Sequence, residues 1–521
     1  MFLAQAPAAP LEVPSVDYAA VLPMLIVFGV ACIGVLVEAF APKSMRWGIQ
    51  VTISLGAILA SGVSLILYAT GSTATKAGTT TFSGSISVDR PSLFLWGTLL
   101  LLGLGAVFLI ADRKVEPGGA FVAQAAIRPG TVQDRAQAAT TSQTEVFPLT
   151  LFALGGMMTF CAANDLLTMF IALEVLSLPL YLMCGLARRR RLISQEAAVK
   201  YFLLGAFSSA FFLYGLALLY GYADSVKLAD IAHAAAGSDR SDTLLFAGLG
   251  LLVVGLLFKG SVGPFHTWTP DVYQGAPTPV TGFMAACTKV AAFGAILRVL
   301  SVGFSSTSWE WRGVMWAVAI ISMALGAILG LTQTDVKRMI AYSSVAHAGF
   351  LLVGAIAMTE DGLSSTLFYL LAYGFTTLAA FGVVSLVRDS SGEATHLSAW
   401  AGLAKRSPLL AGVFTFLLLA LAGIPLTSGF VGKFVVFSAA LSDGMAPLVV
   451  IALVFSAVAA FFYLRVIVLM YFSEPAADGP TVTVPGGFTT AAIALGVVVT
   501  LVLGVLPAFA LDWAGAGGFA S

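Results

Sequence analysis

The sequence predicts an all-α polytopic membrane protein, and three observations carry this prediction. Of the 521 residues, 59% are hydrophobic and only 10% are charged, whereas soluble domains usually carry about 25% charged residues. The mean hydropathy of +0.96 means more apolar surface than a water-soluble core can hide. Apolar runs of roughly 20 residues, the length that spans a bilayer as a helix, recur along the chain. The net charge of zero gives no indication of nucleic acid binding.

We expect about 14 transmembrane helices. The connections between them are mostly short, and none can fold as a separate soluble domain. The longest, Asp112–Glu145, is polar and predicts a flexible surface loop. The first apolar run has no basic residue before it and is long enough to span, so we expect no cleaved signal peptide. The candidate spans are residues 18–40, 47–70, 91–111, 146–163, 165–187, 195–221, 243–273, 279–303, 312–333, 336–358, 362–388, 408–441, 446–472 and 486–511.

Loop charges predict how the helices are oriented. With the N-terminus outside, the cytoplasmic loops carry fifteen basic residues and the opposite loops carry five, which satisfies the positive-inside rule. Both termini then lie on the outer side of the membrane, as an even helix count requires. The Arg188–Arg191 run is interpreted as a topology anchor at the headgroups rather than a functional patch. The cytoplasmic set is Lys43, Arg46, Arg113, Lys114, Arg128, Arg135, Arg188–Arg191, Lys337, Arg338, Arg388, Lys405 and Arg406, and the opposite set is Lys76, Arg90, Lys227, Arg240 and Arg312.

Several charged residues cannot be explained by topology, because they fall inside predicted spans. A charge near the bilayer centre costs at least about 2.5–3.5 kcal/mol on insertion scales, which makes such residues functional candidates. Arg298 and Arg465 cannot be deprotonated and are expected to be structural counter-charges. Glu38 lies close enough to a helix end to reach water. The full set is Lys200, Lys259, Lys289, Arg298, Lys433, Arg465, Glu38, Glu174 and Glu196.

Two spans are too long for one straight helix, and both contain helix-breaking residues. Residues 243–273 include Gly263 and Pro264, and residues 408–441 include Gly423 and Pro425. Proline removes a backbone hydrogen bond, and carbonyls freed inside a membrane need another polar partner. Paired broken helices in the two halves of a chain indicate a transport site. A simple packing kink is the alternative.

The two halves of the chain also resemble each other. The segment Tyr201–Ser209 aligns without gaps on Tyr369–Thr377, and the two broken spans are separated by the same five helices. An odd number of helices per repeat inverts the second copy in the membrane. We therefore expect two inverted five-helix repeats. The expected regions are 1–145 (three helices and the polar loop), 146–303 (helices 4–8), 312–472 (helices 9–13) and 473–521 (helix 14).

The buried charges are predicted to form a lateral proton relay. Glu174, Lys259 and Lys289 lie near mid-depth of their spans, and Lys433 is displaced toward the outside. Removal from water disfavours the charged form of a lysine, and a nearby carboxylate favours it. Changing the separation of Glu174 and Lys259 would thus load or release a proton. His347 titrates near neutrality and could relay, or it could be a satisfied buried polar group.

Glu196 and Lys200 are secondary relay candidates at the cytoplasmic end of their helix. Their i,i+4 spacing fits a structural ion pair equally well. The four cysteines lie in apolar stretches without metal-ligand spacing and are interpreted as packing residues: Cys32, Cys161, Cys184 and Cys287. No motif predicts a metal, an iron–sulfur cluster or a phosphate-binding loop in this chain.

Three segments resemble a known family. The segments Phe258–Pro277, Gln333–Gly349 and Gly423–Phe434 closely resemble subunit N of bacterial NADH-quinone oxidoreductase, respiratory complex I. The sequence motif WTPDVYQGAP, and a lysine rather than a glutamate at position 433, favour subunit N over the related antiporter-like subunits. The resemblance covers helices four to thirteen.

The resemblance implies a proton-translocating subunit of the membrane arm. It implies that Glu174 pairs with Lys259, that Lys289 is the central lysine and that Lys433 lies beside the exit, with Lys200 and His347 on the same polar axis. NADH, FMN, iron–sulfur clusters and quinone are then expected in partner subunits, and a second antiporter-like subunit among the neighbours. A subunit of a sodium/proton antiporter complex, which shares this fold, and a structural scaffold with vestigial charges are the alternatives.

Overall fold

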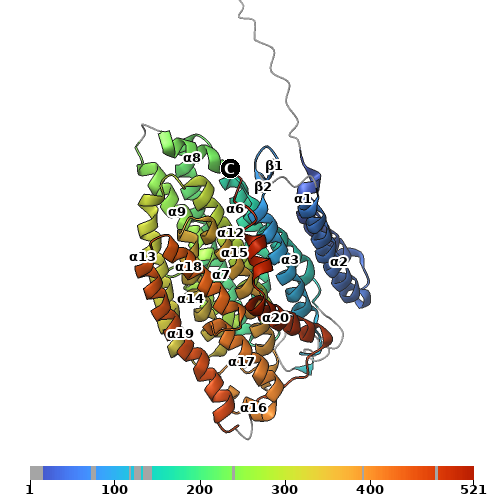
Figure 1. Ribbon diagram of the computed structural model, residues 1–521. Helices are drawn as coiled ribbons and strands as arrows, with labels where there is room; N and C mark the ends of the chain where they lie inside the picture. Colours follow the sequence, from blue (N-terminus) through green and yellow to red (C-terminus); the bar gives the residue numbers. More distant parts are fainter. Residues whose placement is uncertain are drawn as a thin grey trace, which may run out of the picture.

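The computed structural model describes residues 16–71, 78–116, 119–122, 131–132, 143–237, 241–389, 392–475 and 479–520. Within them the protein is an elongated bundle of roughly parallel and antiparallel helices (Figure 1). Lys76, Arg128, Arg135 and Arg240, which entered the charge balance, lie outside the described residues, as does most of the predicted loop 112–145. The prediction of an all-α membrane fold is confirmed.

Helices occupy every predicted span. Eleven helical segments in the described part of the chain are long and apolar enough to cross a membrane. The number of crossings and the repeats stay predictions. The helices are α1 Tyr18–Phe40, α2 Lys43–Thr70, α3 Arg90–Ala111, α5 Val146–Ala162, α6 Leu166–Cys184, α7 Arg191–Ala223, α8 Leu228–Gly237, α9 Thr243–Lys259, α10 Trp268–Gly275, α11 Thr278–Phe283, α12 Lys289–Arg298, α13 Ser308–Thr332, α14 Val336–Ile356, α15 Glu360–Val384, α16 Leu403–Arg406, α17 Pro408–Ala422, α18 Ser428–Ser442, α19 Ala446–Phe472, α20 Gly487–Val505 and α21 Ala508–Ala514.

The two predicted breaks are present. Helix α9 ends at Lys259 and α10 begins at Trp268, while α17 ends at Ala422 and α18 begins at Ser428. Gly423 has φ +88°, which suits a residue without a Cβ at a helix C-terminus. The last predicted span, 486–511, is interrupted as well, because α20 ends at Val505 just before a proline.

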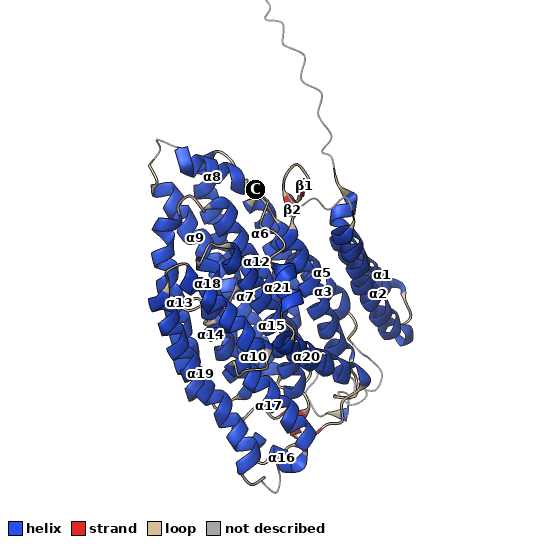
Figure 2. Ribbon diagram, in the orientation of Figure 1, coloured by secondary structure: helices blue, strands red, loops and turns tan. Residues whose placement is uncertain are grey.

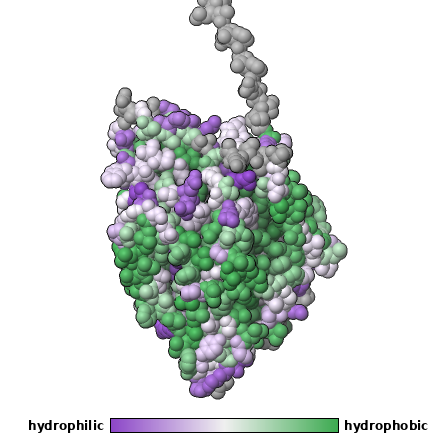
Figure 3. Space-filling model, in the orientation of Figure 1, coloured by the Kyte–Doolittle hydropathy of each residue, from purple (hydrophilic) through white to green (hydrophobic). Residues whose placement is uncertain are grey.

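The helices form a core and a lipid-like exterior. Helices α14 and α15 and the segment Thr278–Gly303 are almost completely buried, as expected for helices that are apolar on all sides. Large apolar side chains of outer helices α7 and α19 are exposed, for example Phe207 and Phe461. Figure 3 shows hydrophobic residues through the middle of the visible face and hydrophilic residues mainly at its two ends.

Short strands, which the all-α prediction did not include, lie at both ends of the bundle (Figure 2). At one end, β1 (Thr79–Thr81) pairs antiparallel with β2 (Ile86–Val88). At the other end, β3 (Val387–Asp389) pairs with both β4 (Gly392–Glu393) and β5 (Thr481–Val482). We call the β3 end, which carries Arg188–Arg191 and Arg388, the basic end.

Both described chain ends lie opposite the basic end. Asp17 donates its backbone N–H to Thr81, and the backbone N–H of Ala520 bonds the carboxylate of Asp89, which directly follows β2. An even number of passes through the bundle is consistent with this arrangement.

Equivalent helices of the predicted repeats start at opposite ends. Helix α6 is capped by Asp165, which lies beside Lys227 at the β1–β2 end. Helix α14 is capped by Asp335, which bonds Thr395 at the basic end. Both aspartates accept the backbone N–H three residues later, which satisfies a free donor of the first turn.

Candidate functional site

Lys259 lies at the C-terminal end of α9, inside the first break. Its Nζ donates to Ser177 Oγ at 2.7 Å and to the Tyr201 hydroxyl at 3.0 Å. The same ammonium faces the rings of Tyr181 and Tyr201 at 5.8 and 5.1 Å from their centroids, a cation–π arrangement. The lysine is thus buried but solvated by hydroxyls and aromatic faces.

The backbone groups freed by this break have side-chain partners. Trp268 Nε1 donates to the carbonyl oxygen of Phe258 at 2.9 Å. Ser322 Oγ accepts from the backbone N–H of Gly263 and donates to the Val345 carbonyl. Ring stacking of Trp268 on Tyr201, with centroids 4.6 Å apart, also fixes the hydroxyl that binds Lys259.

Glu174 lies one helical turn before Ser177 on α6. Its Oε1 is buried and has no hydrogen-bond partner, and no ion pair joins Glu174 to Lys259 in this structure. Ser177 occupies the position that a direct partner of Lys259 would take. Glu174 therefore lies one turn of α6 away from the serine that binds Lys259, and no hydrogen bond or ion pair joins the two predicted partners.

Lys289 follows a π-helical turn, Met284–Thr288, at the centre of the molecule. Such turns are frequent at functional sites. Its Nζ donates to the carbonyl oxygens of Ser344, at 2.7 Å, and Gly260, at 3.3 Å, and lies 5.4 Å from the ring centroid of Tyr373. Lys289 therefore joins the first break to helix α14.

His347, on α14, bridges two tyrosines. Its Nδ1 lies 2.7 Å from the hydroxyl of Tyr369, and its Nε2 lies 3.3 Å from that of Tyr463. Tyr463 in turn bonds Ser343. Each ring nitrogen thus faces one hydroxyl, which is the arrangement that a proton relay through a histidine requires.

Lys433 lies at the second break. Its Nζ donates to the carbonyl oxygens of Leu421 and Ala422, at 3.2 and 2.8 Å, and to Ser456 Oγ at 2.9 Å. A Cβ on Gly423 would lie 3.0 Å from the Lys433 side chain, so the glycine leaves room for the lysine. Phe350 presents its ring 5.1 Å from the same ammonium.

These groups form one buried polar line across the bundle, from α6 through α9, α12 and α14 to α18. In contrast, Lys200 and Glu196 lie at its margin. Lys200 is 41% exposed and pairs with Glu196 at 2.7 Å and with Asp271 at 2.6 Å, and Asp271 also pairs with Arg338. This placement favours the structural interpretation of the Glu196–Lys200 pair.

The two arginines expected to be structural differ in their surroundings. Arg298 is fully buried and donates to both carboxylate oxygens of Asp89, at 2.8 and 2.9 Å, and to Ser92 Oγ and the Cys161 carbonyl. Arg465 is exposed and bonds the carbonyl oxygen of Leu331. The Arg298–Asp89 pair agrees with a counter-charge role.

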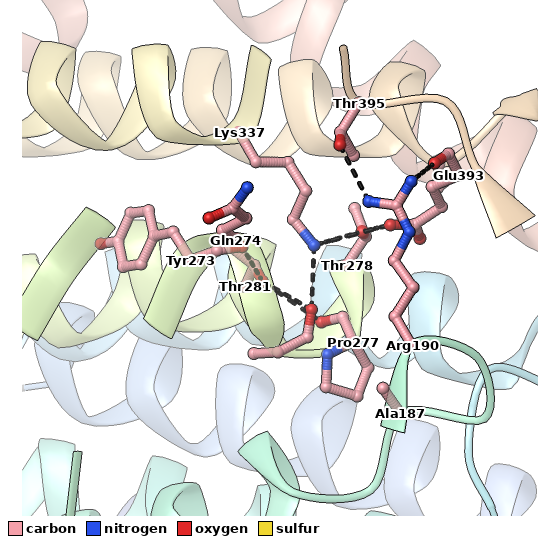
Figure 4. A network of polar contacts seen from close by, with 12 residues as sticks. Ala187, Arg190, Tyr273, Gln274, Pro277, Thr278, Thr281, Lys337, Glu393 and Thr395 are labelled. Atoms are coloured by element: carbon pink, nitrogen blue, oxygen red, sulfur yellow. Dashed lines mark hydrogen bonds and ion pairs between the residues drawn. The ribbon is translucent and has the colours of Figure 1, made fainter. Parts of the chain in front are cut away.

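Sequence reasoning missed one buried lysine. Lys337 was assigned to a loop, but it is the second residue of α14 and is 1% exposed. It bonds Thr278 and the Ala276 carbonyl and pairs with Glu393 (Figure 4). Its helical spacing could have revealed it, because Lys337 and Ser344 are seven residues apart and so share a face.

The arginines at the start of α7 form ion pairs and hydrogen bonds within the protein, which a topology anchor at the lipid headgroups would not need. Arg189 pairs with Glu116, and Arg190 bonds Thr395 and the Glu393 carbonyl oxygen. The two bonds of Arg190 join the two halves of the chain at the basic end.

Cysteines and metal-ligand residues show no assembled site in the described residues. All four cysteines are free thiols, and three of them are buried. No group of three or more His, Cys, Asp or Glu side chains is placed to hold a metal ion there.

Comparison with known proteins gives consistent matches. Residues 163–460 match the family described as NADH:quinone oxidoreductase/Mrp antiporter, TM. The chain is 76% identical to NADH-quinone oxidoreductase subunit N of Saccharopolyspora erythraea, over 98% of this chain and 99% of that protein. A chain of respiratory complex I from Thermus thermophilus with bound aureothin aligns with TM-score 0.75 and 34% identity, over 95% of this chain and 100% of that one. A chain of the Mrp complex from a Dietzia species aligns with TM-score 0.80 at 23% identity, over 96% and 97% of the two chains, which shows a shared fold alone.

Proposed function

The chain belongs to the NADH-quinone oxidoreductase subunit N family, and we propose that it moves protons along the buried line from Glu174 through Lys259 and Lys289 to Lys433. It is an antiporter-like, multi-pass membrane subunit. The complex from Thermus thermophilus is a respiratory complex I, so the partners are other membrane-arm subunits, with a second antiporter-like subunit among them.

One observation carries the proposal: three lysines and a histidine, all at most 6% exposed, lie buried in the bundle, and Lys259, His347 and Lys433 each contact serine or tyrosine hydroxyls. Buried charges of this kind are costly in a membrane protein and persist where they serve transport. The hydroxyls are donors and acceptors at once, and can pass a proton by exchanging their hydrogen bonds.

Glu174 and Lys259 act as the switch of this line. In the present arrangement Lys259 is held by Ser177 and Tyr201, and Glu174 Oε1 is free. Movement of Lys259 from Ser177 to Glu174 stabilises the ammonium, and movement back favours release of its proton. His347, with its two tyrosines, carries protons between Lys289 and Lys433, and Lys433 lies nearest the outer exit.

Redox chemistry takes place in the partner subunits. NADH, FMN, iron–sulfur clusters and quinone are bound there, and this chain holds no redox site. Two observations support the assignment: the sequence has no phosphate-cradling glycine loop before a helix, and the buried cysteines are dispersed single thiols.

The basic end faces the cytoplasm of a bacterial cell, and both termini lie outside. The excess of lysine and arginine at this end supports the orientation, as does the position of both described chain ends at the opposite side. The chain contains two inverted five-helix repeats, 146–303 and 312–472, between an N-terminal region and a C-terminal helix. The opposite starts of α6 and α14 support the inversion.

A role in a sodium/proton antiporter complex is the second candidate. The alignment with the Dietzia Mrp chain favours it only as far as the shared fold, whereas the 76% identity to subunit N favours complex I. Sodium uptake by the purified complex without any proton signal would support the antiporter.

Replacing Lys259 with alanine tests the proposal. In complexes reconstituted into vesicles, we expect NADH-driven acidification to be lost in K259A and kept in K405A, since Lys405 is an exposed lysine paired with Glu474. A native gel checks assembly. Undiminished pumping by an assembled K259A complex would point to a scaffold instead.

A further inference from the structure

Lys337 is a buried lysine that the proposed relay does not use. Its Nζ donates to the Ala276 carbonyl at 2.9 Å and to Thr278 Oγ1 at 3.0 Å, and lies 3.5 Å from a Glu393 carboxylate oxygen. Figure 4 shows the lysine directed between the start of α11 and the β4 strand that carries Glu393. A buried lysine with three polar partners is held in place at considerable desolvation cost, which calls for a role.

The three side chains form a continuous chain of hydrogen bonds. Lys337 donates to the Thr278 hydroxyl, and that hydroxyl donates to the carboxylate of Glu393. The Glu393 side chain is 20% exposed, whereas that of Lys337 is 2% exposed. The chain therefore leads from a group that meets water to one that does not.

A small cavity of about 30 Å³ at the basic end borders this chain and is lined by both Glu393 and Lys337. Two carboxylates line the cavity. The carboxylate oxygens of Glu116 lie 3.1 Å from a guanidinium nitrogen of Arg189 and 3.0 Å from one of Arg388, whereas Glu393 pairs with Lys337. Glu393 is thus the carboxylate that is coupled to a buried base. The charged groups that face the cavity are Glu116, Arg188, Arg189, Arg190, Arg388 and Lys337, together with Glu393.

The route continues inward along α14. Ser344 lies seven residues after Lys337, on the same face of the helix and about 10.5 Å further on. Its carbonyl oxygen binds Lys289. The hydroxyls of Ser344, Tyr373 and Thr377 are buried without a hydrogen-bond partner, and buried polar groups of this kind usually bind water.

We propose that Glu393, Thr278 and Lys337 form a proton-uptake site at the basic end, which supplies Lys289 through the hydroxyls of Ser344, Tyr373 and Thr377. The inference rests on the proposed relay and adds the place where protons join it.

The transfer balances in protons and charge. The Glu393 carboxylate takes a proton from hydronium in the cavity and becomes a carboxylic acid. Lys337 releases one N–H proton to water bound among the hydroxyls of Ser344, Tyr373 and Thr377, and this water passes a proton on to the neutral amine of Lys289, which becomes an ammonium. Glu393 then gives its proton to Thr278 Oγ1 while Thr278 passes its own to the neutral amine. The carboxylate and the ammonium are restored, and one proton has moved inward.

The experiment measures NADH-driven proton pumping by the whole complex in vesicles at several pH values on the uptake side. We expect E393Q to pump more slowly at about pH 8 by roughly tenfold or more, because side-chain proton transfer typically contributes roughly 10²–10⁴-fold. The deficit shrinks toward about pH 6, where hydronium is more abundant and replaces the carboxylate as donor. A structural defect would lower the rate equally at each pH.

Matched variants separate this role from packing and from cavity charge. T278S keeps the bridging hydroxyl and is expected to pump normally, whereas T278V removes it and is expected to resemble E393Q. E116Q makes the same charge change in the same cavity without touching Lys337, and is expected to keep the wild-type pH profile.

Two results would overturn the inference: wild-type pumping by E393Q, or the same pH profile for E393Q and E116Q. The variant K289A distinguishes failure of the inference from failure of the relay. If K289A pumps normally, the relay itself is wrong, and if K289A is defective while E393Q is normal, only the uptake site is wrong.

Discussion

Replacing Asp89 with asparagine removes the carboxylate that neutralises Arg298. The guanidinium is 0% exposed and its Nη2 bonds both carboxylate oxygens of Asp89. Asparagine keeps the shape of the side chain and an oxygen that can cap α3 through the Ser92 N–H. The substitution therefore isolates the loss of charge from the loss of the helix cap.

The expected cost is large, because an arginine that loses its partner stays charged inside the protein. Breaking a buried ion pair on one side costs about 3–5 kcal/mol, equivalent to a change of roughly 10²–10⁴ in the equilibrium between folded and unfolded protein. D89A should cost about 0.5–2 kcal/mol more, since it also removes the helix cap.

A double-mutant cycle provides the assay. We expect D89N to lower the thermal midpoint and the cellular amount of the assembled complex, and the double variant D89N/R298M to recover most of the loss, because no unpaired charge remains. Loss in the double variant equal to the sum of the two single losses would refute the reasoning, since it would show that the pair contributes no coupling.

Two further predictions follow from close contacts and from the second break. A Cβ on Gly326 would lie 2.3 Å from the backbone nitrogen of Ala346, so G326A should push α13 away from α14. We expect the free energy of unfolding to fall by about 1–3 kcal/mol, and the thermal midpoint to fall with it. The matched variant G313A, on the same helix with open space around it, should be neutral or slightly stabilising, and equal losses in both would contradict the contact argument. S456A removes one of three acceptors of the Lys433 ammonium, and hydrogen bonds to charged groups contribute about 1.5–3 kcal/mol. We expect slower proton pumping with normal assembly, and pumping at the wild-type rate would show that Ser456 does not position Lys433.

Much of the fold was predictable because lipid restricts the chain to helices of a certain length. The breaks at Lys259 and Gly423 could be located from glycine and proline alone, since both residues act locally on the backbone. The additional end at Val505 was missed although Pro507 follows it, because the surrounding apolar run is long enough for one helix.

The site was predictable in its residues but not in its contacts. Lys259, Lys289 and Lys433 stand out by charge in apolar sequence, and the structure buries all three. Their actual partners are hydroxyls and carbonyl oxygens from other helices, which no spacing rule links to a lysine. Glu174 was therefore expected against Lys259, while Ser177 holds that position.

Assigning a basic residue to a loop because it is charged was least reliable for residues in the first turn of a helix. Lys337 was counted with the cytoplasmic loops because it is the second residue of the predicted span 336–358, but packing against the start of α11 and strand β4 buries it. Sequence position gives no information about which distant segment covers a helix end.

The two broken helices also supply the counter-charge for the lysines beside them. Lys289 binds the Gly260 carbonyl, just past the C-terminus of α9, and Lys433 binds two carbonyls at the C-terminus of α17. A helix C-terminus carries about half a negative charge, which stabilises a cation. Main-chain carbonyl oxygens are not basic enough to take up a proton, so neither lysine can transfer its proton to the carbonyl groups that bind it. A proton that leaves Lys289 or Lys433 must go to another group of the line.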